Sequence, residues 1–218
     1  MEMTRTTLAE LAAAGPAAAR VLQRHRLDFC CGGRRSLEEA CAERGIDPQV
    51  LLAEIESRPA EMDVRPESLA PVALVDFIIA RFHEPLREEL TRLVQMAGKV
   101  ERVHRDKPSC PVGLALHVAD MRDGLCEHMA KEEQILFPMI RAGFGPRAHM
   151  PITMMMAEHE DHAENLRRTR ALTADLVAPS DACGTWRALY DGLRELELDL
   201  MRHVHLENNV LFPAVLNG

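Results

Sequence analysis

The sequence has few aromatic residues and no long apolar run. Of its 218 residues, one is Trp, one is Tyr and six are Phe. A packed core must therefore be built from Leu, Ala, Val and Met, and the hydrophobic content of 47% is ample for one. No stretch of about 18 apolar residues occurs, and the N-terminus lacks a basic start that leads into a long apolar segment. These absences argue against both a membrane-spanning helix and a signal peptide.

Cysteine and positive charge are scarce as well. The six cysteines, two of which are adjacent, do not resemble the disulfide framework of a small secreted protein. A reducing cytoplasm is therefore the expected location. The formal net charge is −8, which disfavours nucleic acid and anionic membranes as partners.

The first part of the chain, 1–57, predicts a small domain of short helices. Thr7 and Ser36 stand where a side-chain oxygen can cap the start of a helix, and Asp47 precedes a proline at the start of another. The next segment, 58–68, contains two prolines and residues of both charges. That composition is typical of a linker.

The remaining residues, 69–218, change to the pattern of long amphipathic helices. Pro85 is expected to bend the first helix just past His83, because proline removes a helical hydrogen bond. We predict an all-α fold, in which the small N-terminal helical domain precedes an antiparallel four-helix bundle with approximate twofold symmetry. The expected long helices cover about 69–98, 111–140, 151–176 and 182–215.

One stretch of the sequence occurs twice, as an internal repeat. H-M-A-K-E-E-Q-I-L-F-P at 128–138 returns as H-V-H-L-E-N-N-V-L-F-P at 203–213, at an offset of 75 residues. In each copy a His and a Glu are four residues apart, which places both side chains on one face of a helix. Upstream, His83 and His159 are related by an offset of 76 residues. The repeat indicates duplication of a helical hairpin.

The repeated His and Glu side chains predict a metal centre. Imidazole suits transition metals, and a carboxylate can bridge two ions. With both glutamates bridging, each ion receives two nitrogens and two oxygens, and an oxo or hydroxo bridge leaves about one open position in a six-coordinate site. This composition favours two irons, with manganese second, over zinc in a closed structural site. The candidate ligands are His83, His128, Glu132, His159, His203 and Glu207.

Other polar residues receive lesser roles. Glu158 is either a residue that supports a ligand or handles protons, or an ordinary surface glutamate. His104 follows His83 by 21 residues, about 31 Å along a continuous helix, so it reaches the same site only where the chain folds back. The remaining histidines are interpreted as surface or satisfied core residues: His25, His117, His149, His162 and His205.

The adjacent thiols of Cys30 and Cys31 are the other chemical feature. The glycines that follow them permit backbone angles that other residues avoid. Two such thiols can form a mixed disulfide, ligate a metal or accept one from a partner, whereas a disulfide between neighbours has tight geometry. The alternative is that one cysteine is simply buried and the cysteine beside it has no chemical role. The other cysteines are interpreted as ordinary helix or loop residues: Cys41, Cys110, Cys126 and Cys183.

Four segments together resemble one family: L-D-F-C-C-G-G at 27–33, K-V-E-R-V-H-R-D-K-P-S at 99–109, K-E-E-Q-I-L-F-P-M-I at 131–140 and L-E-N-N-V-L-F-P at 206–213. The family is that of the bacterial repair-of-iron-centres proteins, and the resemblance covers nearly the whole chain. It implies a cysteine-pair domain followed by a hemerythrin-like bundle. It also implies that the six repeated side chains hold two iron ions and that Cys30 and Cys31 are functional thiols.

The resemblance implies a function as well. It points to a cytoplasmic protein that restores iron-sulfur clusters damaged by nitrosative or oxidative stress, by delivering iron or by reducing nitric oxide. Damaged iron-sulfur proteins and a small diatomic ligand would be the partners. Two alternatives stay open: a hemerythrin-like oxygen or nitric-oxide carrier or sensor without catalysis, and iron storage or delivery without redox catalysis. Because His104 lies in the V-E-R-V-H segment, a role near the metal or its access path is also open.

Overall fold

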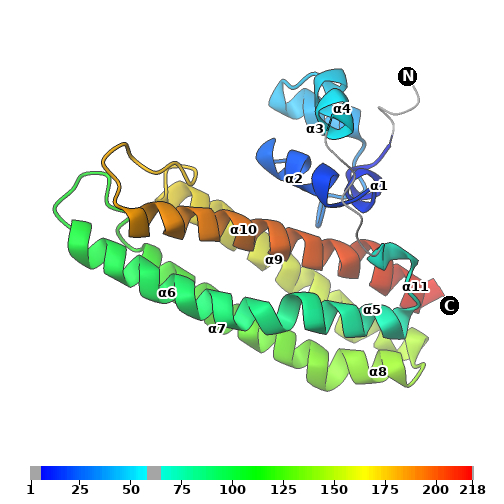
Figure 1. Cartoon of the computed structure of the whole chain (residues 1–218). Helices are drawn as coiled ribbons and strands as arrows, with labels where there is room; N and C mark the ends of the chain where they lie inside the picture. Colours follow the sequence, from blue (N-terminus) through cyan, green and yellow to red (C-terminus); the bar gives the residue numbers. More distant parts are fainter. Residues whose placement is uncertain (1–5, 58–64, 218) are drawn as a thin grey trace.

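A computed structural model describes residues 6–57 and 65–217, and it confirms the predicted all-α fold. Within these residues the backbone forms helices and no strand, apart from a single bridge between Thr7 and Ser36. Figure 1 shows the short N-terminal helices α1–α4 against one face of a bundle of long helices. Most of the expected linker lies outside the described residues, and the division into 1–57, 58–68 and 69–218 stays a prediction.

Local sequence sets the ends of the N-terminal helices. Thr7 and Ser36 each accept the backbone N–H of a glutamate three residues on, and that glutamate accepts the cap's own N–H in return. Asp47 caps the last of these helices, ahead of a proline at its first position. The three predicted caps are thus confirmed. The helices are α1 (Leu8–Ala13), α2 (Pro16–Arg24), α3 (Leu37–Arg44) and α4 (Pro48–Glu56).

Removal of the Ser36 cap gives a stability prediction. The Ser36 hydroxyl accepts the Glu39 N–H at 3.3 Å, and no other group at this helix end replaces it among the described contacts. Ser36→Ala is expected to lower the free energy of unfolding by about 1 kcal/mol in denaturant titration. Thr91→Ala is the matched control, because that hydroxyl binds only the Arg87 carbonyl within a helix. A loss no larger in Ser36→Ala than in the control would contradict the assigned cap.

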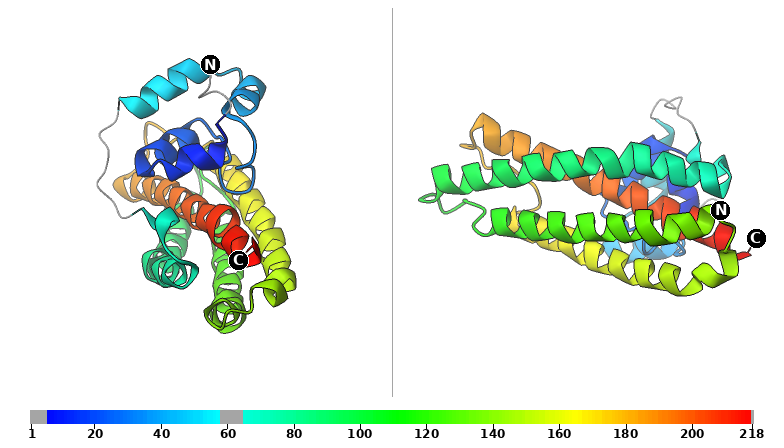
Figure 2. Two further views of the ribbon diagram at one scale, coloured as in Figure 1. Left: turned by 90° about the vertical axis from the view of Figure 1, so that its right-hand side faces the viewer. Right: turned by 90° about the horizontal axis from the view of Figure 1, so that it is seen from below.

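Four long helical segments form the bundle. Figure 2 shows them side by side in two further views, and its left view shows the N-terminal helices lying over α10. Each segment except one is interrupted by a wider π-helical turn. In chain order the elements are η2 (Pro66–Ser68), α5 (Pro71–Ile78), η3 (Ile79–His83), α6 (Glu84–His104), α7 (Leu114–Lys131), η4 (Glu132–Leu136), α8 (Phe137–Arg141), η5 (Gly145–Ala148), α9 (His149–Leu172), α10 (Gly184–Leu206), η6 (Glu207–Leu211) and α11 (Phe212–Asn217).

Prolines explain the π-helical turns. Pro85, Pro138 and Pro213 each stand within two residues of the end of a π segment. Proline has no N–H and its ring clashes with the carbonyl four residues before it, so one widened turn accommodates it without ending the helix. The helix α9 has no proline at the corresponding place and stays a regular α-helix. A π-helical turn thus precedes each of these prolines, the first over Ile79–His83, while the bend predicted just past His83 stays a prediction.

Two helix ends differ from the prediction. The first long segment continues through Gly98 to His104, because a single half-buried glycine weakens a helix without breaking it. The third ends at Leu172, four residues early. Beyond it, three consecutive residues have positive φ, and the Asp175 N–H bonds back to the Arg170 carbonyl at 2.7 Å. This left-handed turn closes the helix.

Buried apolar side chains form two clusters with a polar layer between them. One cluster fills the end of the bundle near α5, α8 and α11, with Ile78, Phe137 and Phe212 among its members. The other runs from Leu90 and Leu125 along the bundle and into the N-terminal helices. Along the long helices, the predicted ligands fall between residues of one cluster and residues of the other. The apolar layers thus close the centre of the bundle to bulk water.

The N-terminal helices contact the bundle through α10 and η6. The Gln23 amide donates to the Arg194 carbonyl at 2.8 Å and to a Glu197 oxygen at 2.9 Å. From η6, the Asn209 amide donates to the Cys30 carbonyl at 3.1 Å. These contacts hold the cysteine loop beside the bundle, a relation that the sequence left open. Within the described residues, each helix is too short or too polar to cross a membrane.

Candidate metal centre

The repeated His and Glu side chains converge in the middle of the bundle. All six are buried, with at most 1% of each residue exposed. Their ligand atoms form two groups in which the members lie within 4.8 Å of one another, and both glutamates belong to both groups. The first group adds His83 and His203 to the glutamates, and the second adds His128 and His159.

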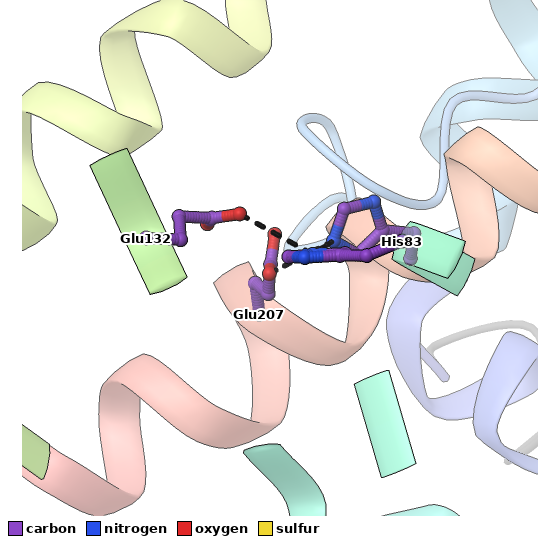
Figure 3. Close-up of side chains that lie close together, drawn as sticks. His83, Glu132 and Glu207 are labelled. Carbon is purple, nitrogen blue, oxygen red and sulfur yellow. Dashed lines mark hydrogen bonds and ion pairs between the residues drawn. The ribbon is translucent and has the colours of Figure 1, made fainter. Parts of the chain in front are cut away.

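The two glutamates face each other from separate helices. Figure 3 shows the Glu132 and Glu207 carboxylates pointing toward each other and toward the His83 ring. The nearest oxygen of Glu132 is 3.4 Å from His83 Nε2, and Glu207 has an oxygen 3.2 Å from His159 Nε2. Burial, and then the facing Glu207 charge, raise the pKa of Glu132 well above its usual value. Burial opposes ionisation of Glu207 too, but the adjacent His203 and His159 lower its pKa overall.

Hydrogen bonds fix the orientation of three of the four imidazoles. His83 Nδ1 donates to Glu133 at 2.7 Å, and His128 Nδ1 donates to Glu158 at 2.8 Å. His159 Nδ1 donates to the Asn208 side-chain oxygen at 2.8 Å. With Nδ1 protonated in a neutral ring, Nε2 carries a lone pair. Each of these rings therefore presents a basic nitrogen to the centre.

This arrangement fits a cation better than it fits a cavity without one. The Nε2 atoms of His128 and His159 lie 3.1 Å apart, and both of their Nδ1 protons are already committed elsewhere. Two lone pairs at that distance repel unless a positive charge lies between them. Both oxygens of Glu132 and one of Glu207 have no hydrogen-bond partner although they are buried. Buried unpaired carboxylates are costly, and metal ions are a common way to offset that cost.

Burial keeps His83 and His128 neutral at neutral pH, the form in which an imidazole can bind a metal ion. Burial, reinforced by the neighbouring His203, lowers the pKa of His83 to about 4. Burial and the adjacent His159 lower the pKa of His128 to about 4 in the same way. A neutral imidazole can bind a metal ion, whereas a protonated one cannot.

The two halves of the repeat differ in the residues that support the imidazoles. At the offset of 75 residues, Glu133 corresponds to Asn208, and each binds the histidine of the neighbouring helix. At the offset of 76, Glu158 corresponds to Phe82, whose ring stacks on His203 with centroids 5.5 Å apart. His203 Nδ1 consequently has no hydrogen-bond partner. Each half-site thus has one supporting carboxylate, placed on a different histidine.

Glu158 thus accepts a hydrogen bond directly from the candidate ligand His128, and its loss gives a testable prediction. Partial burial raises its pKa, but hydrogen bonds from Lys131 and His128 bring the pKa below its ordinary value, so it accepts as a carboxylate. Glu158→Ala is expected to weaken metal affinity by about 10- to 100-fold in chelator competition. Glu160→Ala, an exposed neighbour on the same helix, is the control. Equal affinity in the two variants would remove Glu158 from the centre.

The structure separates the other histidines into those near the centre and those far from it. His162, interpreted as ordinary, is buried with its ring 4.8 Å from the His128 ring. His117 is a satisfied core residue bound to Thr169 at 3.0 Å. His104 lies near the far end of α6, with Nε2 3.2 Å from Cys183 Sγ, and it takes no part in either ligand group. The helix therefore does not fold back toward His83.

Sequence reasoning missed the supporting residues Glu133 and Asn208. Each follows a predicted ligand glutamate directly in the chain, so it points in a different direction around the helix from that ligand. From that position it faces the adjacent helix and not the bundle axis. The repeat itself held a signal, since these residues occupy equivalent positions in the two copies. Because one of them is a glutamate and the other an asparagine, comparison of the two copies did not reveal this signal.

The cysteine loop lies against the same region of the bundle. Cys31 Sγ is 3.7 Å from the His159 backbone carbonyl and 4.0 Å from the Asn208 amide nitrogen. Asn208 in turn accepts from His159 Nδ1. One side chain therefore contacts both a predicted functional thiol and a predicted ligand. Cys30 is buried, and the neighbouring Cys31 thiol, burial and Asp28 all raise its pKa well above the usual value.

Comparisons with known proteins agree with this arrangement. Residues 75–215 match the family model of the hemerythrin HHE cation binding domain. Residues 4–58 match the model of the ScdA_N domain, which is described as a domain of unknown function. The first match spans more than half of the chain, and all six predicted ligands lie within it.

Relatives resemble the chain over its whole length. It is 47% identical to the iron-sulfur cluster repair protein YtfE of Musicola paradisiaca, over 224 residues that cover all of this chain and 99% of that protein. The protein of the same name from Yersinia pseudotuberculosis is 45% identical over 222 residues, which cover both chains completely. That of Dickeya chrysanthemi is 46% identical over 216 residues, or 97% of each chain. The chain therefore belongs to the repair-of-iron-centres family, the iron-sulfur cluster repair proteins with a hemerythrin-type cation-binding domain.

Proposed function

We propose that the chain holds two iron ions between the four buried histidines and the two shared glutamates. The observation that carries this proposal is the sharing itself, since Glu132 and Glu207 each belong to both ligand groups. Two nitrogens and two carboxylate oxygens for each ion suit a non-haem iron pair. Paired irons supply a change of oxidation state and open positions for a small diatomic ligand.

The residues around the centre have separable roles in this proposal. Glu133, Glu158 and Asn208 orient the imidazoles and raise their basicity. The apolar layers on either side exclude bulk water and hold the two carboxylates at a fixed separation. Lys131 and Arg87, which pair with Glu158 and Glu133, keep those carboxylates ionised as acceptors. The chain thus provides a set of ligand atoms that are fixed in position and strongly basic.

We infer that the protein repairs iron-sulfur clusters damaged by nitrosative or oxidative stress. Support comes from relatives named for that repair and from the position of Cys30 and Cys31 beside the centre. Iron delivery and nitric oxide reduction are the two routes that the centre supports chemically. A cytoplasmic location belongs to the same proposal, because all six cysteines are free thiols.

The second candidate is a hemerythrin-like protein that binds oxygen or nitric oxide without catalysis. It is favoured by the enclosure of the centre, since all six predicted ligands are buried. Such a carrier needs the bundle but makes no use of the cysteine loop. The two candidates therefore differ in what they require of Cys30 and Cys31.

One set of assays separates them. Anaerobically purified protein is analysed for metal and by Mössbauer spectroscopy, which reports metal identity, number and bridging. Reduced protein is then incubated with a cluster enzyme that nitric oxide has damaged, and separately with nitric oxide alone. Recovered enzyme activity or nitrous oxide formation supports repair. If neither appears while a diatomic ligand still binds reversibly, the carrier function replaces the repair function.

The cysteine pair gives the matched variant. Cys30→Ser with Cys31→Ser is expected to keep both irons and to lose repair, whereas Cys183→Ser, at an exposed thiol far along the chain, is the control. Undiminished repair in the double variant would favour the carrier or an iron store in which the thiols have no part. A site that holds both irons against a mild chelator in every oxidation state would count against iron delivery.

A further inference from the structure

A second cluster of potential metal ligands lies outside the bundle centre. Asp28, Cys30 and Cys31 each offer one ligand atom, and these atoms lie within 4.8 Å of one another. Cys30 Sγ is 3.9 Å from Cys31 Sγ and 3.1 Å from the Asp28 oxygen Oδ1. Two thiols and a carboxylate form a softer ligand set than the imidazoles and carboxylates of the bundle.

The loop conformation brings both thiols to one side. Asp28 Oδ1 accepts the backbone N–H of Cys30 at 3.1 Å and that of Cys31 at 3.0 Å, which folds the chain around the carboxylate. Gly33 then passes close to the Phe29 carbonyl, where a Cβ would lie 2.5 Å from the oxygen. The turn is thus fixed by residues other than the cysteines themselves.

The separation of the sulfurs suits a shared ion. Two sulfurs held about 2.3 Å from a tetrahedral ion lie about 3.8 Å apart. The observed 3.9 Å is close to that value. A carboxylate oxygen at about 2.1 Å would lie about 3.6 Å from each sulfur, so the Asp28 contact would open by about 0.5 Å. That adjustment is within reach of a side-chain rotation.

The cluster lies between solvent and the bundle centre. On one side, Cys30 and Asp28 line a cavity of about 560 Å³ between the N-terminal helices and the bundle. On the other side, Cys31 touches the backbone of His159 and the amide of Asn208. An ion bound here would be reachable from the cavity and adjacent to a predicted iron ligand.

The charges on the cavity wall do not bar a cation. Arg26 pairs with Asp175, and Arg170 pairs with both Asp175 and Glu197. A third arginine of the wall, Arg167, pairs with Glu164. The other charged residues of the wall are Arg44 and Asp28, whose formal charges cancel.

We propose that Asp28, Cys30 and Cys31 form an exchangeable site for a thiophilic divalent cation, with ferrous iron as the cargo. The inference rests on the proposed iron delivery and names the place where a delivered ion is held outside the two-iron centre. Three protein ligands leave a fourth position open toward the cavity, as expected of a site that releases its ion and unlike a closed structural site. Binding replaces the two thiol protons, which pass to solvent.

Cobalt(II) tests the site without any repair assay. Protein that already carries its two irons receives one equivalent of cobalt(II) under anaerobic conditions, followed by desalting and metal counting. Thiolate ligation gives a near-ultraviolet charge-transfer band, which imidazole and carboxylate ligands do not produce. We expect one additional ion and that band in the unaltered protein. Asp28→Asn is expected to weaken cobalt affinity at least tenfold.

The variants decide between this site and an adventitious one. Cys30→Ser with Cys31→Ser is expected to lose the third ion and the band while retaining both irons. Cys126→Ser, which removes a thiol of the bundle helix α7, is expected to behave like the unaltered protein. A band that survives the double variant, or no third ion in the unaltered protein, would overturn the proposal. Because neither readout depends on repair activity, that failure is distinct from failure of the proposed function.

Discussion

Glu132→Leu is expected to abolish the proposed two-iron centre, so that the iron content falls from the proposed two ions per chain toward none. Glu132 belongs to both ligand groups, so its loss takes one oxygen from each. Each group is then left with two imidazoles and the Glu207 carboxylate. With a shared carboxylate removed, neither half-site keeps its full ligand set. The prediction is checked by measuring the metal content of the protein after purification and desalting.

The same substitution is expected to stabilise the metal-free protein. In that state both Glu132 oxygens are buried without a partner, and the facing Glu207 raises the Glu132 pKa further. Leu fills a similar volume and removes the two buried oxygens that have no hydrogen-bond partner. We expect the free energy of unfolding of metal-free Glu132→Leu to exceed that of the metal-free parent by about 1–3 kcal/mol. Loss of function and gain of stability in one variant are the signature of a residue kept for chemistry.

Glu127→Leu supplies the matched control. Glu127 lies five residues earlier on α7 with its side chain largely exposed, and it pairs with Lys131. Its replacement is expected to leave iron content unchanged and to alter stability by less than about 0.5 kcal/mol. Iron retained in Glu132→Leu, or a metal-free variant less stable than its parent, would mean that Glu132 is not a shared ligand.

The repeat in the sequence was sufficient to bring the six candidate ligands together. A fixed offset relates His128 to His203 and Glu132 to Glu207, and helical spacing places each pair on one face. Because both copies must bury the same face, the six side chains have to meet at the bundle axis. The structure places all six there, which periodicity alone could predict.

The supporting contacts could not be predicted in the same way. Asn208 reaches His159 from a neighbouring helix, and which residue lies opposite depends on helix rotation, which a wider π turn changes locally. The docking of the cysteine loop depends on Asn209 and Gln23, whose partners lie about 180 and 170 residues away in sequence. Contacts between residues so far apart in the sequence produce no periodic sequence pattern from which they could be predicted. The linker expected at 58–68 stays a prediction, since most of it lies outside the described residues.

Gly33→Ala is expected to displace the cysteine loop from the bundle. A Cβ at this position would lie 2.5 Å from the Phe29 carbonyl oxygen, 3.0 Å from the Ala9 Cβ and 3.1 Å from the Asn209 side-chain oxygen. The first of these atoms is backbone and cannot move alone. Overpacking of this kind costs about 1–3 kcal/mol. Because the clash falls on the docked loop, the cost is expected to appear as local opening before global unfolding.

Alkylation of Cys30 measures that opening. The residue lines the cavity but is only 6% exposed in the docked loop, so its reaction with reagent is expected to be faster when the loop opens. If about 1.4 kcal/mol of the clash acts on docking, the open population and the alkylation rate rise about tenfold. The measurement uses a Cys31→Ser background, so that mass spectrometry reports one thiol of the loop. Iron content is expected to stay unchanged, since the bundle holds all six candidate ligands.

Gly124→Ala is the control for a glycine-to-alanine change as such. Gly124 lies within α7, and a Cβ there meets nothing within 4 Å. That substitution is expected to stabilise the helix by about 0.5–1 kcal/mol and to leave Cys30 alkylation as it was. An alkylation rate in Gly33→Ala equal to that of the control would show that the close approach at Phe29 does not hold the loop. The contact between Cys31 and the His159 backbone would then need another cause.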